Sequence, residues 1–345
     1  MRPWRVQVQA WRMLHNDSVR EPGPKRLPVL TTTPCSEFVP ELFAPDAIDH
    51  DTRAFNANLA RKLADIPPHS SQPASALREA QESGRGIFGP LVFSDMAVNR
   101  TIPGPSGPLT IRAFVPATVK GVYLHLHGGG FVLGGAHHQD RQLEALATRA
   151  EVVVVSLAYR LAPEHPYPAG PDDCEATAVW LTLHAQSEFG STRLLIGGPS
   201  AGACLAVVTL LRLRDKHQLR SFSRANLAFG VYDLAMTPSA RRATDTLVVN
   251  TSDFEWLVDQ FGVRGIEREP DVSPIWADLH DLPPALFTIG TLDPLIDDTL
   301  FMHARWIAAG NPARLAIYPG GVHGFSGFPT ALGLQATERM IEFLS

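Results

Sequence analysis

The stretch RLLIGGPSAGACLAVV, residues 193–208, joins two apolar runs through a turn of small residues. Residues 193–198 predict a buried strand, and residues 201–216 predict a largely apolar helix. Ser200 stands between them in a G-x-S-x-G pattern. In a turn of this kind the serine backbone is strained and its hydroxyl is lifted clear of the chain. The pattern alone is a weak signal, because a tight turn around a buried serine explains it equally well.

Strand and helix patterns alternate on both sides of this turn. Residues 151–160, EVVVVSLAYR, form a short β-branched run of the kind expected for a strand buried on both faces. The predicted strands are 91–98, 109–116, 122–127, 151–160, 193–198, 226–233, 284–291 and 314–320, and the helices are 172–189, 201–216, 295–309 and 331–344. This alternation predicts an α/β fold, with a mostly parallel central sheet flanked by helices on both faces.

Two further segments predict a helical cap. Residues 45–68 carry apolar side chains at helical spacing and end at a proline pair, and residues 76–83 form a second short helix. Residues 239–265 interrupt the alternation of strands and helices. We therefore expect an N-terminal arm with cap helices over 1–85 and a catalytic domain over 86–345, with 239–265 contributing to the cap. Most aromatic side chains of these segments are expected in the cap core, and a few against substrate.

Composition excludes several classes of protein. The chain of 345 residues has a net charge of −5, which does not fit a nucleic-acid binder. No run approaches the roughly 18 apolar residues of a membrane helix. The N-terminus has no continuous apolar segment typical of a signal peptide. Three scattered cysteines, Cys35, Cys174 and Cys204, do not predict a disulfide framework, so we expect a cytoplasmic protein.

A glycine run follows the strand at 122–127. In His127-Gly128-Gly129-Gly130, backbone N–H groups can face a site without obstruction by side chains. Together with the N–H that follows Ser200, such groups can hold the oxyanion of a tetrahedral intermediate. The candidate donors are Gly128, Gly129 and Ala201. A flexible loop is the alternative, whereas the patterns typical of a phosphate-binding loop are missing.

Two further candidate residues lie just past strand ends, where open α/β sheets place their ligands. Asp293 follows the strand at 284–291, and His323 follows the strand at 314–320. The order Ser200, Asp293, His323 is that of α/β-hydrolases. Asp297 and Asp298 compete as the acid, but we expect them to face the N-terminus of a helix.

The histidines also allow a metal site to be considered. His125 and His127 alternate along one predicted strand and share a sheet face, and His137 and His138 follow shortly. No cysteine or carboxylate pattern of metal spacing accompanies them. We therefore expect no metal and no cofactor, and activity that is unchanged by EDTA.

Several long motifs occur together in one order: HLHGGGFVLG, VSLAYRLAPEHPYPAG, GGPSAGACLA, GTLDPLIDD and YPGGVHGF. Over roughly residues 90–345 the chain resembles the hormone-sensitive-lipase-like esterases of the α/β-hydrolase superfamily. The resemblance implies a catalytic triad of Ser200 as nucleophile, His323 as base and Asp293 as orienting acid. It also implies an oxyanion hole of Gly128, Gly129 and Ala201, a supporting role for His127, and an ester of short to medium acyl length as substrate.

The chain departs from this family at one catalytic position. The family usually has aspartate or threonine before the serine, whereas this chain has Pro199, which lacks a backbone N–H. We expect an effect on rate or pH profile rather than a different nucleophile. Amide, carbamate or lactone hydrolysis stays open on the same site, as does a ligand receptor of the same fold. The resemblance also allows a homodimer, of which the sequence gives no independent sign.

Overall fold

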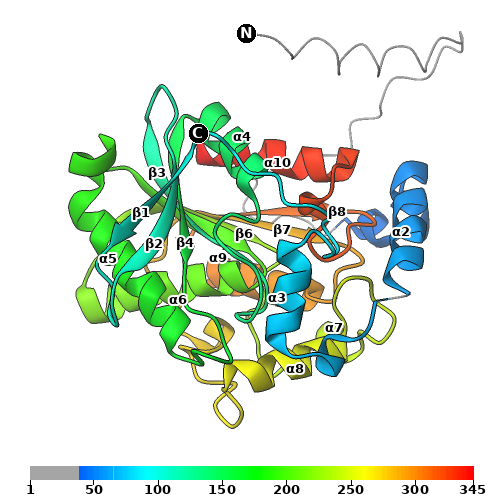
Figure 1. Ribbon diagram of the computed structural model, residues 1–345. Coiled ribbons are helices and arrows are strands. Elements are labelled where there is room, and N and C mark those ends of the chain that lie inside the picture. Colours follow the sequence, from blue (N-terminus) through cyan, green and yellow to red (C-terminus); the bar gives the residue numbers. More distant parts are fainter. Residues whose placement is uncertain (1–38, 65) are drawn as a thin grey trace, which may run out of the picture.

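A computed structural model describes residues 39–64 and 66–345, so that Cys35 and most of the N-terminal arm lie outside the described residues. The described residues form one sheet in the order β1-β2-β4-β3-β5-β6-β7-β8 (Figure 1). The strands are β1 Ala97–Ile102, β2 Leu109–Phe114, β3 Gly121–Leu126, β4 Val152–Ala158, β5 Leu194–Pro199, β6 Phe222–Ala228, β7 Ala285–Gly290 and β8 Ala313–Tyr318. In this order the neighbouring strands from β4 through β8 run parallel, whereas β2 pairs antiparallel with both β1 and β4. The predicted mostly parallel sheet is confirmed.

Helices cover both faces of the sheet, as the alternation of patterns predicts. One face carries α4 Asp140–Ala150 and α10 Ala331–Leu344, and the other carries α5 Ala169–Phe189, α6 Ala201–His217 and α9 Ile296–Ala308 (Figure 1). The strands β3 and β7 are buried along their whole length, because helices lie above and below them. This arrangement places the carboxyl ends of the parallel strands at one edge of the sheet, where the candidate residues follow.

Two predicted strands are displaced in the structure. The first strand covers 97–102 instead of 91–98, and the sixth covers 222–228 instead of 226–233. The first is an edge strand with exposed residues at most positions, so it carries no apolar run that would predict it. Residues Leu91 and Val92, which suggested a strand, line a cavity instead.

Four helices lie in or at the edge of the segments predicted as a cap: α2 His50–Leu63, α3 Ala74–Glu82, α7 Pro238–Arg241 and α8 Thr251–Phe261. The helices expected at 45–68, 76–83 and within 239–265 are all present. The N-terminal segment and the segment 239–265 contact each other, with His69 Nδ1 3.0 Å from Asp253 Oδ1. The Asn56 side chain of α2 donates to Gly320 O at 2.8 Å, which ties the cap to the loop after β8. The division into cap and catalytic domain stays a prediction.

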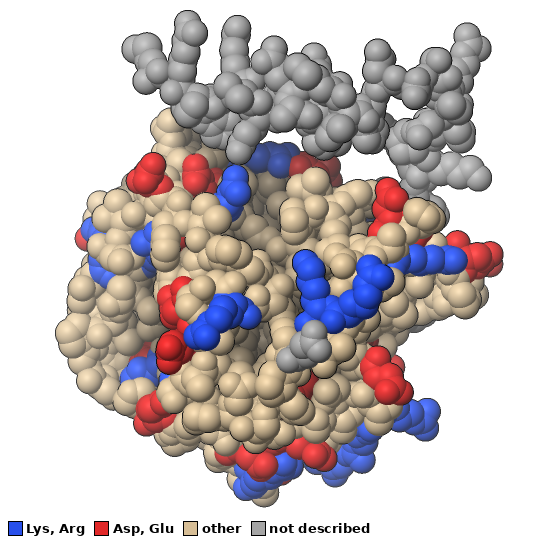
Figure 2. Space-filling view, turned by 45° about the vertical axis from the view of Figure 1, so that its right-hand side comes forward, with Lys and Arg blue, Asp and Glu red and all other residues tan. Residues whose placement is uncertain are grey.

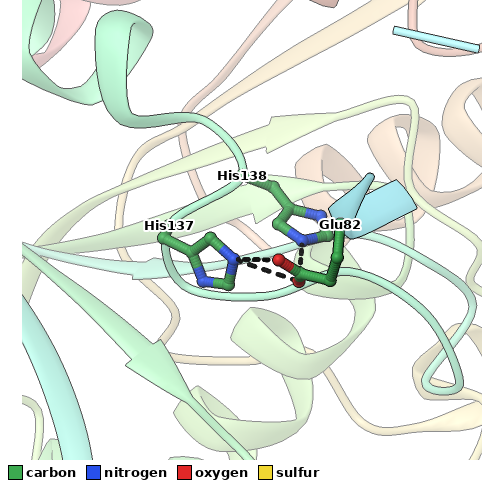
Figure 3. A group of neighbouring side chains, drawn as sticks. All are labelled: Glu82, His137 and His138. Atoms are coloured by element: carbon green, nitrogen blue, oxygen red, sulfur yellow. Dashed lines mark hydrogen bonds and ion pairs between the residues drawn. The ribbon is translucent and has the colours of Figure 1, made fainter. Parts of the chain in front are cut away.

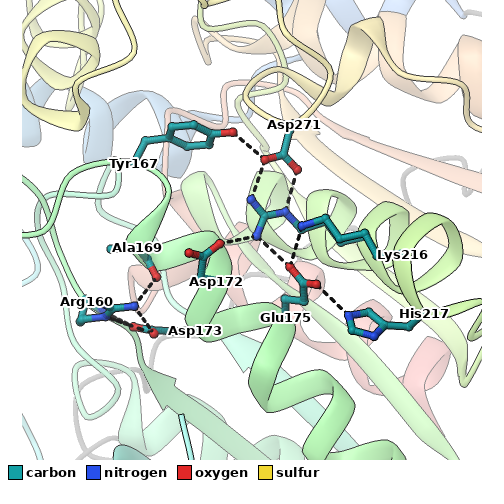
Figure 4. Close-up of polar contacts among 10 residues, drawn as sticks. Arg160, Tyr167, Ala169, Asp172, Asp173, Glu175, Lys216, His217 and Asp271 are labelled. Carbon is teal, nitrogen blue, oxygen red and sulfur yellow. Dashed lines mark hydrogen bonds and ion pairs between the residues drawn. The ribbon is translucent and has the colours of Figure 1, made fainter. Parts of the chain in front are cut away.

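An ion-pair network joins α5 and α6 to the segment before β7 (Figure 4). The Arg212 side chain is 5% exposed, and its guanidinium donates to Asp172 at 2.8 Å, Glu175 at 3.0 Å and Asp271 at 2.7 Å. Burial opposes the charge of Asp271, but hydrogen bonds from Arg212 and Tyr167 keep the pKa of its carboxyl below the usual range. A buried guanidinium with several carboxylate partners is compensated, whereas losing it leaves those charges unpaired.

On the face drawn in Figure 2, acidic and basic side chains are interspersed over a largely uncharged surface. No helix in the described part of the chain is long and apolar enough to cross a membrane. Cys174 and Cys204 are free, buried thiols, in keeping with the prediction for these two residues.

Candidate active site

The turn at Ser200 has the strained geometry that its pattern predicts. Ser200 has φ +56° and ψ −122°, an unusual conformation for a residue with a side chain, directly between β5 and α6. Its backbone N–H donates to Ala228 O of β6 at 2.9 Å. A Cβ atom added at Gly198 or Gly202 would lie 1.9 Å from Leu126 O. Both flanking positions therefore require glycine, because strand and helix meet here at van der Waals distance.

The structure brings together the three residues predicted as a triad. His323 Nε2 lies 3.0 Å from Ser200 Oγ, and His323 Nδ1 lies 3.1 Å and 3.0 Å from the two carboxylate oxygens of Asp293. The Asp293 carboxylate is buried and also accepts the N–H of Leu295 at 2.9 Å. The edge of the Phe229 ring contacts His323, with 5.3 Å between ring centroids. In this arrangement the imidazole can accept the serine proton while a fixed carboxylate holds its other nitrogen.

The loop after β3 lies beside Ser200. A Cβ atom at Gly128 would lie 3.0 Å from Pro199 O and 3.4 Å from Ser200 Cβ, and Gly129 has φ +114°. In the described part of the chain, the N–H groups of Gly128, Gly129 and Ala201 donate no hydrogen bond. The Ala201 N–H also begins α6, whose N-terminus favours negative charge. These unpaired donors beside the serine can stabilise an oxyanion.

The side chain of His127 supports this loop from beneath. Its Nδ1–H donates to Gly128 O at 2.8 Å, and its ring stacks on Tyr159 with 4.1 Å between centroids. The Tyr159 hydroxyl in turn donates to His127 O at 2.8 Å. Burial lowers the pKa of His127 to about 3, so the ring is neutral near pH 7. Its contacts fit the supporting role that the resemblance implies.

A cavity of about 930 Å³ opens above Ser200 and His323. Its walls come from both parts of the cap and are mainly apolar, and they include Ile66, Leu77, Phe88, Val249, Phe254 and Leu257. A Cβ atom at Gly130 would lie 2.5 Å from both Leu257 methyl carbons, so α8 rests directly on the glycine loop. Of the aromatic side chains in the predicted cap segments, Phe254 lines the cavity, whereas Phe55 and Phe261 pack against other rings. Phe88, just after the first segment, lines the cavity and also packs against Phe328.

A model of the family described as the alpha/beta hydrolase fold matches residues 123–327. The chain belongs to this family. Carboxylic ester hydrolase LipN of Mycobacterium tuberculosis is 32% identical over 249 residues, which are 69% of this chain and 66% of that protein. An acetyl esterase of Salmonella schwarzengrund is 30% identical over 236 residues, covering 65% of this chain and 71% of that protein.

A solved hydrolase structure agrees with the fold. The hyperthermophilic esterase from the archaeon Pyrobaculum calidifontis is 28% identical to this chain, with a TM-score of 0.78, and covers 86% of this chain and 97% of its own. The predicted fold class and the resemblance to the HGGG esterases of this superfamily are confirmed.

The two competing acids of this hydrolase lie in the first turn of α9, as expected, and have other partners. Asp297 Oδ2 accepts the N–H of Ser239 at 2.8 Å. Asp298 accepts from Tyr232 N–H at 2.7 Å, Asp233 N–H at 2.9 Å and the Thr237 hydroxyl at 2.6 Å. Burial raises the pKa of Asp298 to about 7, although these hydrogen bonds partly offset the effect. Both acids therefore hold the segment that leads into the cap.

The histidines considered for a metal separate into two groups. His125 Nδ1 lies 2.9 Å from Ser156 Oγ, and burial lowers the pKa of His125 to about 4. His137 and His138 instead converge on Glu82 at the end of α3 (Figure 3). No local sequence pattern pairs a carboxylate with these histidines, because Glu82 lies more than fifty positions earlier and only folding brings it there. The sequence signal that could have pointed to Glu82 was its position at the end of a predicted helix.

Pro199 occupies the last position of β5 and lines the cavity. Its ring lies close to the glycine loop, since a Cβ atom at Gly128 would be 3.5 Å from Pro199 Cγ. The following N–H, that of Ser200, still pairs with β6. Proline is therefore accommodated in the turn without disturbing the serine.

Proposed function

We propose that this protein is a serine carboxylesterase that hydrolyses short- to medium-chain acyl esters at Ser200. The observation that carries the proposal is the continuous chain of contacts from Ser200 Oγ through His323 to Asp293, with distances of 3.0 to 3.1 Å. Relatives and solved neighbours named as ester hydrolases support the coarser statement that the chain is an ester-hydrolysing enzyme.

The proposed reaction begins with attack of Ser200 Oγ on the ester carbonyl carbon. His323 Nε2 accepts the serine proton, and the carbonyl oxygen becomes an oxyanion facing the N–H groups of Gly128, Gly129 and Ala201. His323 then returns the proton to the departing alkoxide, and an alcohol leaves. His323 then removes a proton from water as the water attacks the acyl-enzyme carbonyl carbon, and it returns that proton to Ser200 Oγ as the bond to Ser200 breaks and the acid leaves. Asp293 holds the imidazole in the required tautomer and stabilises its cation throughout.

The cavity is better suited to an apolar acyl chain than to a polar substituent. Its volume of about 930 Å³ and its apolar walls, such as Phe254 and Leu257, favour a flexible hydrocarbon close to Ser200. The triad does not determine the leaving group, so amides, carbamates and lactones stay open as alternative substrates, and amides enter the test as competitors. The homodimer and the cytoplasmic location stay predictions.

The test is a panel of p-nitrophenyl esters from acetate to laurate, with the matching p-nitroanilides, on wild type and Ser200→Ala. We expect maximal kcat/KM at short to medium chains, slow anilide cleavage, and a loss of about 10⁴ or more in Ser200→Ala. A preference for anilides would contradict the proposal that the substrate is an ester. Activity of Ser200→Ala close to that of wild type would contradict the assignment of Ser200 as the nucleophile.

A further inference from the structure

Three side chains with metal-binding atoms meet at the rim of the active-site cavity (Figure 3). His137 Nε2 lies 3.0 Å from each carboxylate oxygen of Glu82, and His138 Nε2 lies 2.8 Å from Oε1. One ligand atom from each residue can be chosen so that all three lie within 4.8 Å of one another. None of these residues belongs to the proposed triad or oxyanion hole, so the cluster needs another explanation.

The charge of Glu82 points to a cation at this position. Glu82 is the last residue of α3, where the helix dipole places partial negative charge and disfavours a carboxylate. Its side chain nevertheless turns toward two imidazoles on a separate segment (Figure 3).

The separations between Glu82 and each of the two imidazole nitrogens are close to those in a tetrahedral zinc site. Bond lengths near 2.0–2.1 Å to imidazole nitrogen and carboxylate oxygen place neighbouring ligand atoms about 3.3 Å apart. The observed separations of 2.8 and 3.0 Å would need to open by only a few tenths of an ångström. Gly135 leaves room for the rings, since a Cβ atom there would lie 3.1 Å from His137 Cε1. Phe93 stacks on His137 with 5.8 Å between centroids and restrains its ring.

We propose that Glu82, His137 and His138 bind one zinc ion, with a fourth position open to water. Two imidazoles and one carboxylate are a ligand set that zinc accepts. The side chains are 15% to 50% exposed, which gives a hydrated ion access to the site. Zinc has a structural role here, and no step of ester hydrolysis passes through it.

The ion would fasten α3 to the loop that follows the oxyanion donors. The same helix already contacts this loop through Arg78, which donates to Val132 O at 2.8 Å, and Gln81, which accepts the N–H of Gly134 at 3.1 Å. Glu82 adds a third attachment one residue further along. His138 also lines the cavity above Ser200, so zinc would hold the cap closed at the cavity rim.

Isothermal titration of zinc chloride into EDTA-dialysed, full-length protein tests this site without substrate, and therefore independently of the proposed hydrolysis. We expect one bound zinc per chain in wild type, and at least tenfold weaker binding in Glu82→Gln and in His138→Gln. His217→Gln is the matched control, because His217 contacts a single carboxylate, Glu175, at 2.7 Å. Its affinity for zinc should equal that of wild type.

A second readout keeps the test decisive if a variant folds poorly. Cobalt chloride added to wild type should give the visible absorption of a tetrahedral cobalt site, and zinc should displace it. Zinc should also raise the Tm of wild type and His217→Gln, because a ligand bound only by the native state stabilises it. Absence of zinc binding and of the cobalt band in wild type would refute the site. Equal zinc affinity in folded Glu82→Gln and wild type would also refute it.

Discussion

Replacing Asp293 by asparagine tests how the carboxylate controls His323. Asp293 Oδ1 accepts Leu295 N–H at 2.9 Å, while both oxygens face His323 Nδ1. Asparagine must keep its carbonyl oxygen on the Leu295 N–H, because an amide NH₂ there would oppose another donor. Its NH₂ then faces His323 Nδ1, which must become an acceptor. The proton moves to Nε2, and that nitrogen can no longer accept the proton of Ser200.

This substitution leaves the shape of the site intact, so the loss of activity measures the effect of the His323 tautomer and of the missing carboxylate charge. The expected fall in kcat is about 10⁴, equivalent to about 5.5 kcal/mol of barrier. KM should change little, because the cavity walls are unaltered. Initial rates of p-nitrophenyl butyrate hydrolysis give both constants, and circular dichroism checks that the variant is folded.

Asp297→Asn is the matched control, because Asp297 lies nearby in the first turn of α9 but accepts the N–H of Ser239 at 2.8 Å. Its kcat should remain close to that of wild type. The reasoning fails if folded Asp293→Asn keeps more than about a tenth of the wild-type kcat, or if Asp297→Asn loses as much as Asp293→Asn.

Three further substitutions address the cavity, the pH response and the core. Leu257→Ala should enlarge the cavity and raise the octanoate-to-butyrate ratio of kcat/KM by about tenfold, and unchanged ratios would exclude this wall from acyl selection. The pKa of Asp298 is raised to about 7 in the native state, so the native carboxyl keeps a proton that the unfolded chain has already lost above about pH 4. The free energy of unfolding therefore falls as pH rises from 5 to 8. Relative to Asp298→Asn, wild type should therefore lose about 3 kcal/mol over this interval in urea unfolding, and parallel pH curves would contradict it. Arg212→Met should cost about 3–5 kcal/mol in the same assay by leaving Asp172, Glu175 and Asp271 without the buried guanidinium that pairs with them, whereas exposed Arg220→Met should cost under about 1 kcal/mol.

The sequence predicted six of the eight strands to within two residues and displaced β1 and β6. Strands such as 152–158 are buried on both faces, and this burial requires the continuous apolar runs that identify them. The edge strand at 97–102 is mostly exposed, so its residues obey no apolar pattern. Apolar side-chain patterns therefore reveal strands that are buried, and the exposed strand at 97–102 was misplaced because it has no such pattern.

The grouping of Ser200, Asp293 and His323 could be predicted from the sequence, because each residue lies at a strand end or tight turn with its own local pattern. The contacts made by the cap could not. Leu257 over Gly130, Asn56 on Gly320, and Glu82 between two histidines join segments far apart in the chain. Such pairs depend on how the cap rests on the sheet, which no local periodicity encodes.

The central claim is that Ser200 is an activated nucleophile, and covalent labelling tests it most directly. A fluorophosphonate probe added to wild type should give one stoichiometric adduct, located on Ser200 by mass spectrometry of the digested protein. Ser200→Ala should give no adduct and should lose ester hydrolysis with it. Folded wild type that leaves Ser200 unlabelled, or that carries the probe on another residue while hydrolysing esters, would contradict the proposed mechanism.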